Sequence, residues 1–157
     1  MREGTGPFPV PHWRKRLATN VLPPLMGSYS GELTTSVRDV HLGATRFAGE
    51  ITGVWMSVSG SGKDDSNELN ITGEVFINET TALSTTCKIA HVSGEAAQHK
   101  TTKITGDTGI VQSVINASQN SFSPGDIIKG TFTVERTSSP TTEIRNPCIV
   151  VELEPVN

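Results

Sequence analysis

Cysteine is scarce in this chain of 157 residues, which contains only Cys87 and Cys148. A disulfide scaffold normally uses more cysteines in a shorter chain, so this composition speaks against one. Pairing of these two residues stays open, but buried free thiols are the interpretation we favour.

Long apolar runs are missing too. No segment approaches the ~20 apolar residues of a membrane span. Pro7, Pro9 and Pro11 interrupt the position where a signal peptide would have its apolar region. We therefore expect no membrane partner, and synthesis in a cytoplasm unless an export signal has been removed.

Basic charge is limited as well. The formal net charge is -3, and the only dense basic run is Arg14-Lys15-Arg16. Folded nucleic-acid-binding domains usually carry a basic face that attracts phosphate. We therefore expect no nucleic-acid partner.

Strand-forming and turn-forming residues dominate what is present, with 20 threonines and 15 glycines. In one clear case Leu69, Ile71, Val75 and Ile77 alternate with polar residues, as in a half-buried strand. Seven to nine such short runs are separated by turn-rich segments, among them 59–67 and 138–147. The pattern predicts an all-β fold over residues 27–157, an antiparallel β-sandwich or a barrel.

Patterns for catalysis or metal binding are weak. No Gly-x-Ser-x-Gly elbow exists, and neither cysteine has a recognisable nucleophile context. Asp64, Asp65, Asn67 and Glu68 supply oxygen ligands of the kind calcium takes, but their irregular spacing indicates a solvated, charged turn. The four histidines are scattered. We expect a protein that is not an enzyme and that has no cofactor and no metal.

Trp55 lies in another alternating run. Val54, Met56 and Val58 share one face, so Trp55 is expected on the opposite face or against a neighbour. If it faces outward, it is a candidate for a subunit interface. A core tryptophan is the alternative.

Residues 1–26 hold five of the nine prolines and are predicted to form an extended amino-terminal arm. Burying its apolar side chains is worth ~1.5–3 kcal/mol each, which nearly cancels the ~1–2 kcal/mol per residue needed to order the backbone. The arm is therefore expected to need a partner. A disordered leader, or packing back over its own domain, is the alternative. The candidate partner-binding residues of the arm are Phe8, Trp13, Arg14, Lys15, Arg16, Leu17 and Leu22.

The order of the arm and of the stretches RFAGEITGVWMSVSG, LNITGEVFINETT, FSPGDIIKGTFTVERT and IVVELEPV resembles small structural proteins of tailed phages. These are the jelly-roll capsid decoration (cement) proteins and the related head-fibre or spike modules. The resemblance implies a jelly-roll-like β-sandwich and a virion protein on the capsid exterior that binds the major capsid protein and stiffens the shell. It also implies a homo-oligomer, most typically a trimer at a threefold position.

Two other functions stay open. A receptor- or carbohydrate-binding module of a fibre or tail would stack sugars on aromatic loop tips, but the predicted tips 59–67 and 138–147 contain no Tyr or Trp. A secreted adhesin domain would use the glycosylation triplets that begin at Asn70, Asn78 and Asn116.

Overall fold

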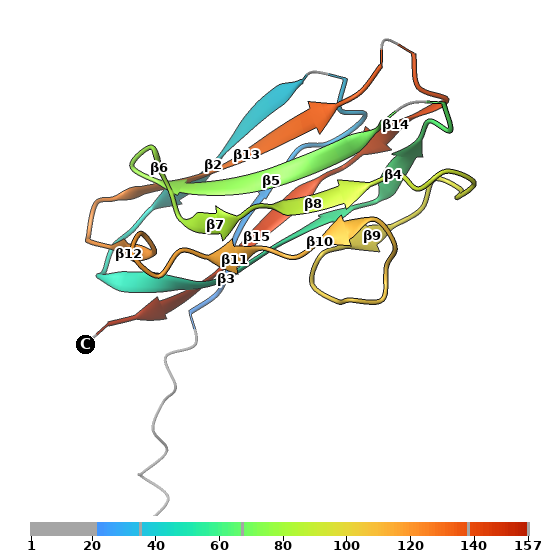
Figure 1. Ribbon diagram of the computed structural model, residues 1–157. Coiled ribbons are helices and arrows are strands. Elements are labelled where there is room, and N and C mark those ends of the chain that lie inside the picture. Colours follow the sequence, from blue (N-terminus) through green and yellow to red (C-terminus); the bar gives the residue numbers. More distant parts are fainter. Residues whose placement is uncertain (1–21, 35, 67, 138, 157) are drawn as a thin grey trace, which may run out of the picture.

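A computed structural model describes residues 22–34, 36–66, 68–137 and 139–156. Two antiparallel sheets lie one over the other, with β2, β13 and β5 in one layer and β15 and β3 in the other (Figure 1). The described residues form strands and turns and contain no helix, so no helix in this part of the chain is long and apolar enough to cross a bilayer.

The first sheet has the order β1 (Leu25–Ser28), β15 (Cys148–Pro155), β3 (Gly49–Val58) and β12 (Ser121–Phe122), and β9 (Lys100–Thr101) also pairs with β3. The second has the order β10 (Ile110–Val111), β8 (Cys87–Ala90), β5 (Asn70–Ile77), β13 (Ile127–Glu135) and β2 (Val37–Ala44), with β6 (Thr80–Thr81) on β5. Two small pairs join β4 (Gly60–Lys63) to β14 (Thr142–Arg145) and β7 (Leu83–Thr85) to β11 (Val114–Ile115).

The strand pairing is nested along the chain. The first long-range pair is β1 with β15, and inside it come β2 with β13, β3 with β12, and β5 with β8. A nested set of antiparallel pairs that folds over into two sheets is a jelly roll. The predicted all-β sandwich is confirmed, and its strand order is that of this fold.

The core lies between the two sheets and follows the predicted alternation. Ile71 and Val75 of β5 are fully buried, as is Met56 of β3. Gly73 allows the sheets to approach, because a Cβ there would lie 2.8 Å from the Cys87 sulfur and 3.0 Å from the Met56 sulfur. This contact joins β5 and β8 of one sheet to β3 of the other.

Both cysteines are free thiols, as favoured from the sequence, but their surroundings differ. Cys87 is buried in the core, and desolvation raises the pKa of its thiol to about 12. Cys148 is only partly buried, and desolvation raises its pKa as well. Because the thiolate is the reactive form, Cys87 is chemically inert in the folded protein.

The structure corrects the prediction that 59–67 and 138–147 are turns. Gly60–Lys63 and Thr142–Arg145 are strands β4 and β14, which pair with each other, and Ile144 is fully buried. Glycine and serine give β4 no apolar alternation, so its extended form comes from long-range pairing that local propensity does not show.

The first strand begins at Leu25, so the sheet starts two residues before the predicted domain boundary at Gly27. Leu25 pairs with Val151, and Met26 pairs with Val150. Leu22 is half-buried and lies just before β1. The remaining arm candidates lie outside the described residues: Phe8, Trp13, Arg14, Lys15, Arg16 and Leu17.

Candidate functional site

The outward side of the first sheet carries an apolar row that crosses three strands. Met26 pairs with Val150, and Val150 pairs with Trp55. Directly paired residues of antiparallel strands project to the same side of the sheet. Their sequence neighbours Ile149 and Met56 are fully buried in the core, so this row faces outward. The prediction that Trp55 points away from the face of Met56 is therefore correct.

We call this surface the Trp55 face. It is formed by outward residues of β1, β15 and β3, among them Met26, Ser28, Glu50, Trp55, Ser57, Cys148, Val150, Glu152 and Glu154.

Exposure within the apolar row is uneven. Met26 is 64% exposed, whereas Val150, between Met26 and Trp55, is only 3% exposed although it is not part of the core cluster. A methionine and a tryptophan that flank a covered valine form a ready apolar contact surface. Aromatic residues and methionine are enriched at protein interfaces.

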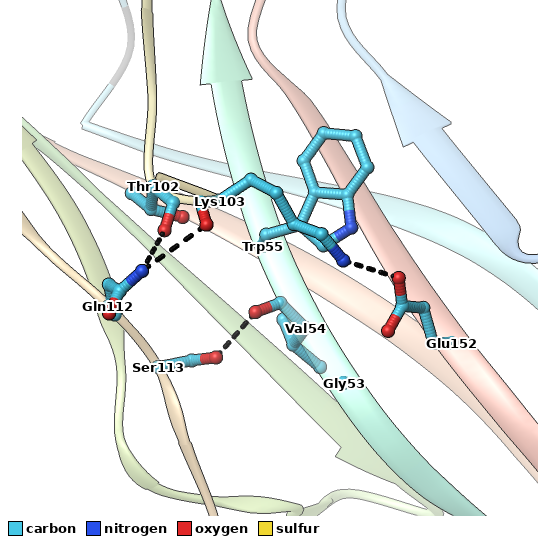
Figure 2. Close-up of a pocket in the computed structure, with 8 residues that line it drawn as sticks. All are labelled: Gly53, Val54, Trp55, Thr102, Lys103, Gln112, Ser113 and Glu152. Atoms are coloured by element: carbon cyan, nitrogen blue, oxygen red, sulfur yellow. Dashed lines mark hydrogen bonds and ion pairs between the residues drawn. The ribbon is translucent and has the colours of Figure 1, made fainter. Parts of the chain in front are cut away.

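An open hollow of about 250 Å³ borders this row and is drawn in Figure 2. Lys103 crosses β3 beside the Trp55 ring, and its ammonium lies 2.5 Å from a Glu152 carboxylate oxygen and 5.5 Å from the ring centroid. The hollow is lined by Gly53, Val54, Trp55, Thr102, Lys103, Gln112, Ser113 and Glu152.

Loop residues of the hollow are fastened to the edge of β3 by hydrogen bonds. The Thr102 amide donates to the Met56 carbonyl over 2.8 Å, and the Met56 amide donates to the Thr102 hydroxyl over 2.9 Å. The Ser113 hydroxyl donates to the Val54 carbonyl, and the side-chain amide of Gln112 donates to the Thr102 carbonyl over 3.1 Å. The wall of the hollow is therefore held in place by the strand that carries Trp55.

Lys100 anchors the same region from inside the fold, and the sequence analysis missed it. Its side chain is fully buried, and its ammonium donates to Glu95 over 2.7 Å, to the Thr108 carbonyl over 2.8 Å and to the Ala90 carbonyl over 3.2 Å. Hydrogen bonds from Lys100 and then Thr108 lower the pKa of the Glu95 carboxyl. Lys100 immediately precedes residues 101–103. This network therefore holds the start of the segment that carries Lys103.

Carboxylates follow the apolar row toward one end of the face. Glu50 lies directly opposite Glu154, and Glu152 is paired with Lys103. Glu50 has only a 3.5 Å contact from the Ser121 hydroxyl, and the described residues offer no ion pair to Glu50 or Glu154. The Trp55 face therefore joins an apolar row to an excess of negative charge.

The opposed pair predicts a stability effect. Like charges directly opposite on neighbouring strands are destabilising, so Glu154→Gln should raise the free energy of unfolding by ~0.2–1 kcal/mol. Urea unfolding of the domain 22–157 measures this, and the gain should shrink in high salt because salt screens the repulsion. Glu74→Gln is the control, since Glu74 pairs with Thr131; an equal gain in both variants would contradict the assignment.

The outward side of the second sheet is polar, and it too carries an aromatic ring with a lysine beside it. Lys129 lies 2.5 Å from Glu79, a hydrogen bond that raises the pKa of the lysine, and Thr131 donates to Asp39 over 2.7 Å. Lys129 also lies 5.3 Å from the centroid of the Phe76 ring. Phe76 with Lys129 and Glu79 therefore matches Trp55 with Lys103 and Glu152, on a face that carries carboxylates of its own, among them Asp39 and Glu74.

The acidic turn at 64–68 uses its carboxylates within the protein. Asp65 accepts from the Gly94 amide over 2.9 Å and lies 3.0 Å from His91 and 3.3 Å from Lys63. The Gly94 amide, followed by His91, lowers the pKa of Asp65 to about 2. Over the described ranges no three His, Cys, Asp or Glu residues are grouped as a metal site, and Asn67 lies outside them.

The face assembles residues that sequence analysis named only in part. Of the predicted site residues, Trp55 lies at its centre, and Leu22 lies just before its edge strand β1. Met26, Val150, Lys103 and Glu152 were missed. The alternation of residues in 148–154 could have predicted part of this face, because every second residue of that strand points outward.

Comparison with protein-family models, curated proteins and solved structures found no match.

Proposed function

We propose that this protein is a non-enzymatic structural protein of a virion. On this proposal it decorates the capsid exterior, binds the major capsid protein and stabilises the shell, with the amino-terminal arm clasping neighbouring subunits. The observation that carries the proposal is the Trp55 face, a sheet surface with an apolar row and an acidic margin that its own fold leaves uncovered at Met26.

The chemistry of this face suits a protein partner. Met26 and Trp55 are residue types enriched at interfaces, and the carboxylates of Glu50 and Glu154 lie at the margin, where charge sets orientation and on-rate. The jelly roll supports the proposal by analogy only, because this architecture serves viral capsid domains and lectins alike.

Reactive groups in the described structure have structural roles. The Cys87 thiol is held protonated by burial, the Lys100 ammonium is shared among three oxygens, and the Asp65 carboxyl is stabilised as an anion. Each of these groups is engaged in the fold, and this supports a binding role over catalysis.

Co-sedimentation with empty shells of the virus's major capsid protein tests the proposal. The full chain should bind, and a chain that starts at Leu22 should fold but bind far more weakly. This truncation keeps Leu25 and Met26 in β1, whereas a chain starting at Gly27 would lose them. Undiminished binding by the truncated chain would contradict the proposed role of the arm in shell binding. Failure of the full chain to bind would overturn the capsid proposal.

A carbohydrate-binding module is the second candidate, and one observation favours it. Trp55 borders an open hollow that also presents Gln112, Ser113 and Glu152, side chains able to hydrogen-bond hydroxyl groups. A glycan array separates the two candidates: saturable binding that is lost in Trp55→Ala would favour a sugar ligand over capsid protein.

A further inference from the structure

We propose that residues 1–21 of one copy dock on the Trp55 face of a second copy. This inference uses the same face as the proposed function and names a first occupant for it, a neighbouring copy of this chain. Capsid protein would then meet the assembled oligomer.

The arm and the face are complementary in chemistry. The arm carries Phe8, Trp13 and Leu17, with three consecutive cations at residues 14–16. The face presents Met26 and Trp55 beside three carboxylates, of which only the one on Glu152 has a lysine partner among the described residues. Aromatic side chains can pack on the apolar row while the cations meet the acidic margin.

The direction of β1 brings the arm to this surface. Leu25 begins the strand opposite Val151, one residue from Glu152, and the strand ends at Ser28 opposite Cys148. The chain therefore enters the sheet at the end where the carboxylates of Glu152 and Glu154 lie. The chain that precedes Leu22 therefore begins at the edge of the Trp55 face.

Reach favours the neighbouring copy over the arm's own domain. Between Gly6 and Gly27 the sequence has five prolines and no glycine. The arm is expected to be extended, and an extended chain spans at most ~3.3 Å per residue. About 20 residues then span ~60 Å, whereas Trp55 lies two strand spacings from β1, ~10 Å. Folding back over so short a distance requires a sharp reversal, and glycine, the residue best suited to one, is missing.

Docking of this type leads to a closed oligomer when the contacts form a ring. An arm that binds a different surface on the next copy makes a head-to-tail contact, which forms a ring when the rotation closes. The prolines limit the conformational entropy that the arm loses on docking.

Sedimentation velocity of single variants and of a mixture tests the inference. The full chain should form an oligomer, and both the chain starting at Leu22 and full-length Trp55→Ala should be at least ~30-fold weaker in self-association. Phe76→Ala on the other sheet is the matched control and should associate like the unmodified chain. The truncated chain retains a face, and Trp55→Ala retains an arm, so mixing them should produce a heavier species that neither forms alone.

The outcomes separate this inference from the proposed function. An unmodified chain that is monomeric, or a truncated chain that still associates fully, would overturn arm docking. A mixture that shows no new species would overturn it too. Shell binding by a monomeric full chain would leave the capsid proposal standing without it. Because Trp55→Ala could disturb the fold, Glu50→Lys with Glu154→Lys serves as a second variant that keeps the tryptophan and should also lose association.

Discussion

Lys100→Met is expected to lower the free energy of unfolding by about 3 kcal/mol. The lysine side chain is fully buried, and its removal takes away the donor to the carbonyls of Ala90 and Thr108 and the cation that pairs with Glu95, which keeps only its hydrogen bond from Thr108. Breaking a buried ion pair costs ~3–5 kcal/mol. The lower end applies because the Glu95 side chain is 21% exposed and can regain water.

Urea unfolding at neutral pH measures this loss, and Lys88→Met is the control. Lys88 also pairs with a glutamate, Glu68, but its side chain is 33% exposed, so its replacement should cost ~0–1 kcal/mol. Equal losses in the two variants would mean that the Lys100 network does not stabilise the fold. A further sign of its role would be faster hydrogen exchange at the Thr102 amide, which bonds to Met56.

Trp55→Ala is expected to weaken binding to capsid shells by at least ~30-fold, the effect of a central aromatic anchor in an interface. Trp55 sits in the middle of the face, beside Val150 on one side and Lys103 over its ring. Its replacement exposes Val150 and removes the surface on which Lys103 lies. Because Trp55 points out of the core, unfolding stability should change much less than binding.

Titration of shells with Trp55→Ala and Phe76→Ala, each checked by urea unfolding, measures this effect. Phe76 has the same arrangement of lysine and glutamate around an aromatic ring, but on the second sheet. Equal affinity of the two variants would show that the partner does not use the Trp55 face.

Sequence patterns predicted the fold where alternation was strong. Ile71 and Val75 alternate with polar residues in β5, and this is the pattern of a strand with one buried side. The same logic gave the outward direction of Trp55 from Met56 and its neighbours. Period-two patterns determine which face a residue occupies, and the structure confirmed these assignments.

The errors come from interactions between distant residues. Strand β4 contains Gly60, Ser61 and Gly62, and only its pairing with β14 makes it extended. The burial of Lys100 could not be predicted from the sequence, because it depends on a glutamate and two carbonyls that the fold brings around the lysine. The Trp55 face needs the register of three strands, which places Met26 and Trp55 on either side of Val150. The spacing of residues along the sequence does not predict which residues of the three strands pair with one another.

Alkylation of Cys148 tests most directly whether the Trp55 face is covered in the assembled protein. Cys148 lies on this face beside Val150, whereas Cys87 is fully buried with its pKa raised to about 12, so a small neutral reagent reports on Cys148. The account predicts that alkylation of the full chain slows as protein concentration rises, while the chain starting at Leu22 reacts at one rate throughout. Equal, concentration-independent rates in both chains would contradict it.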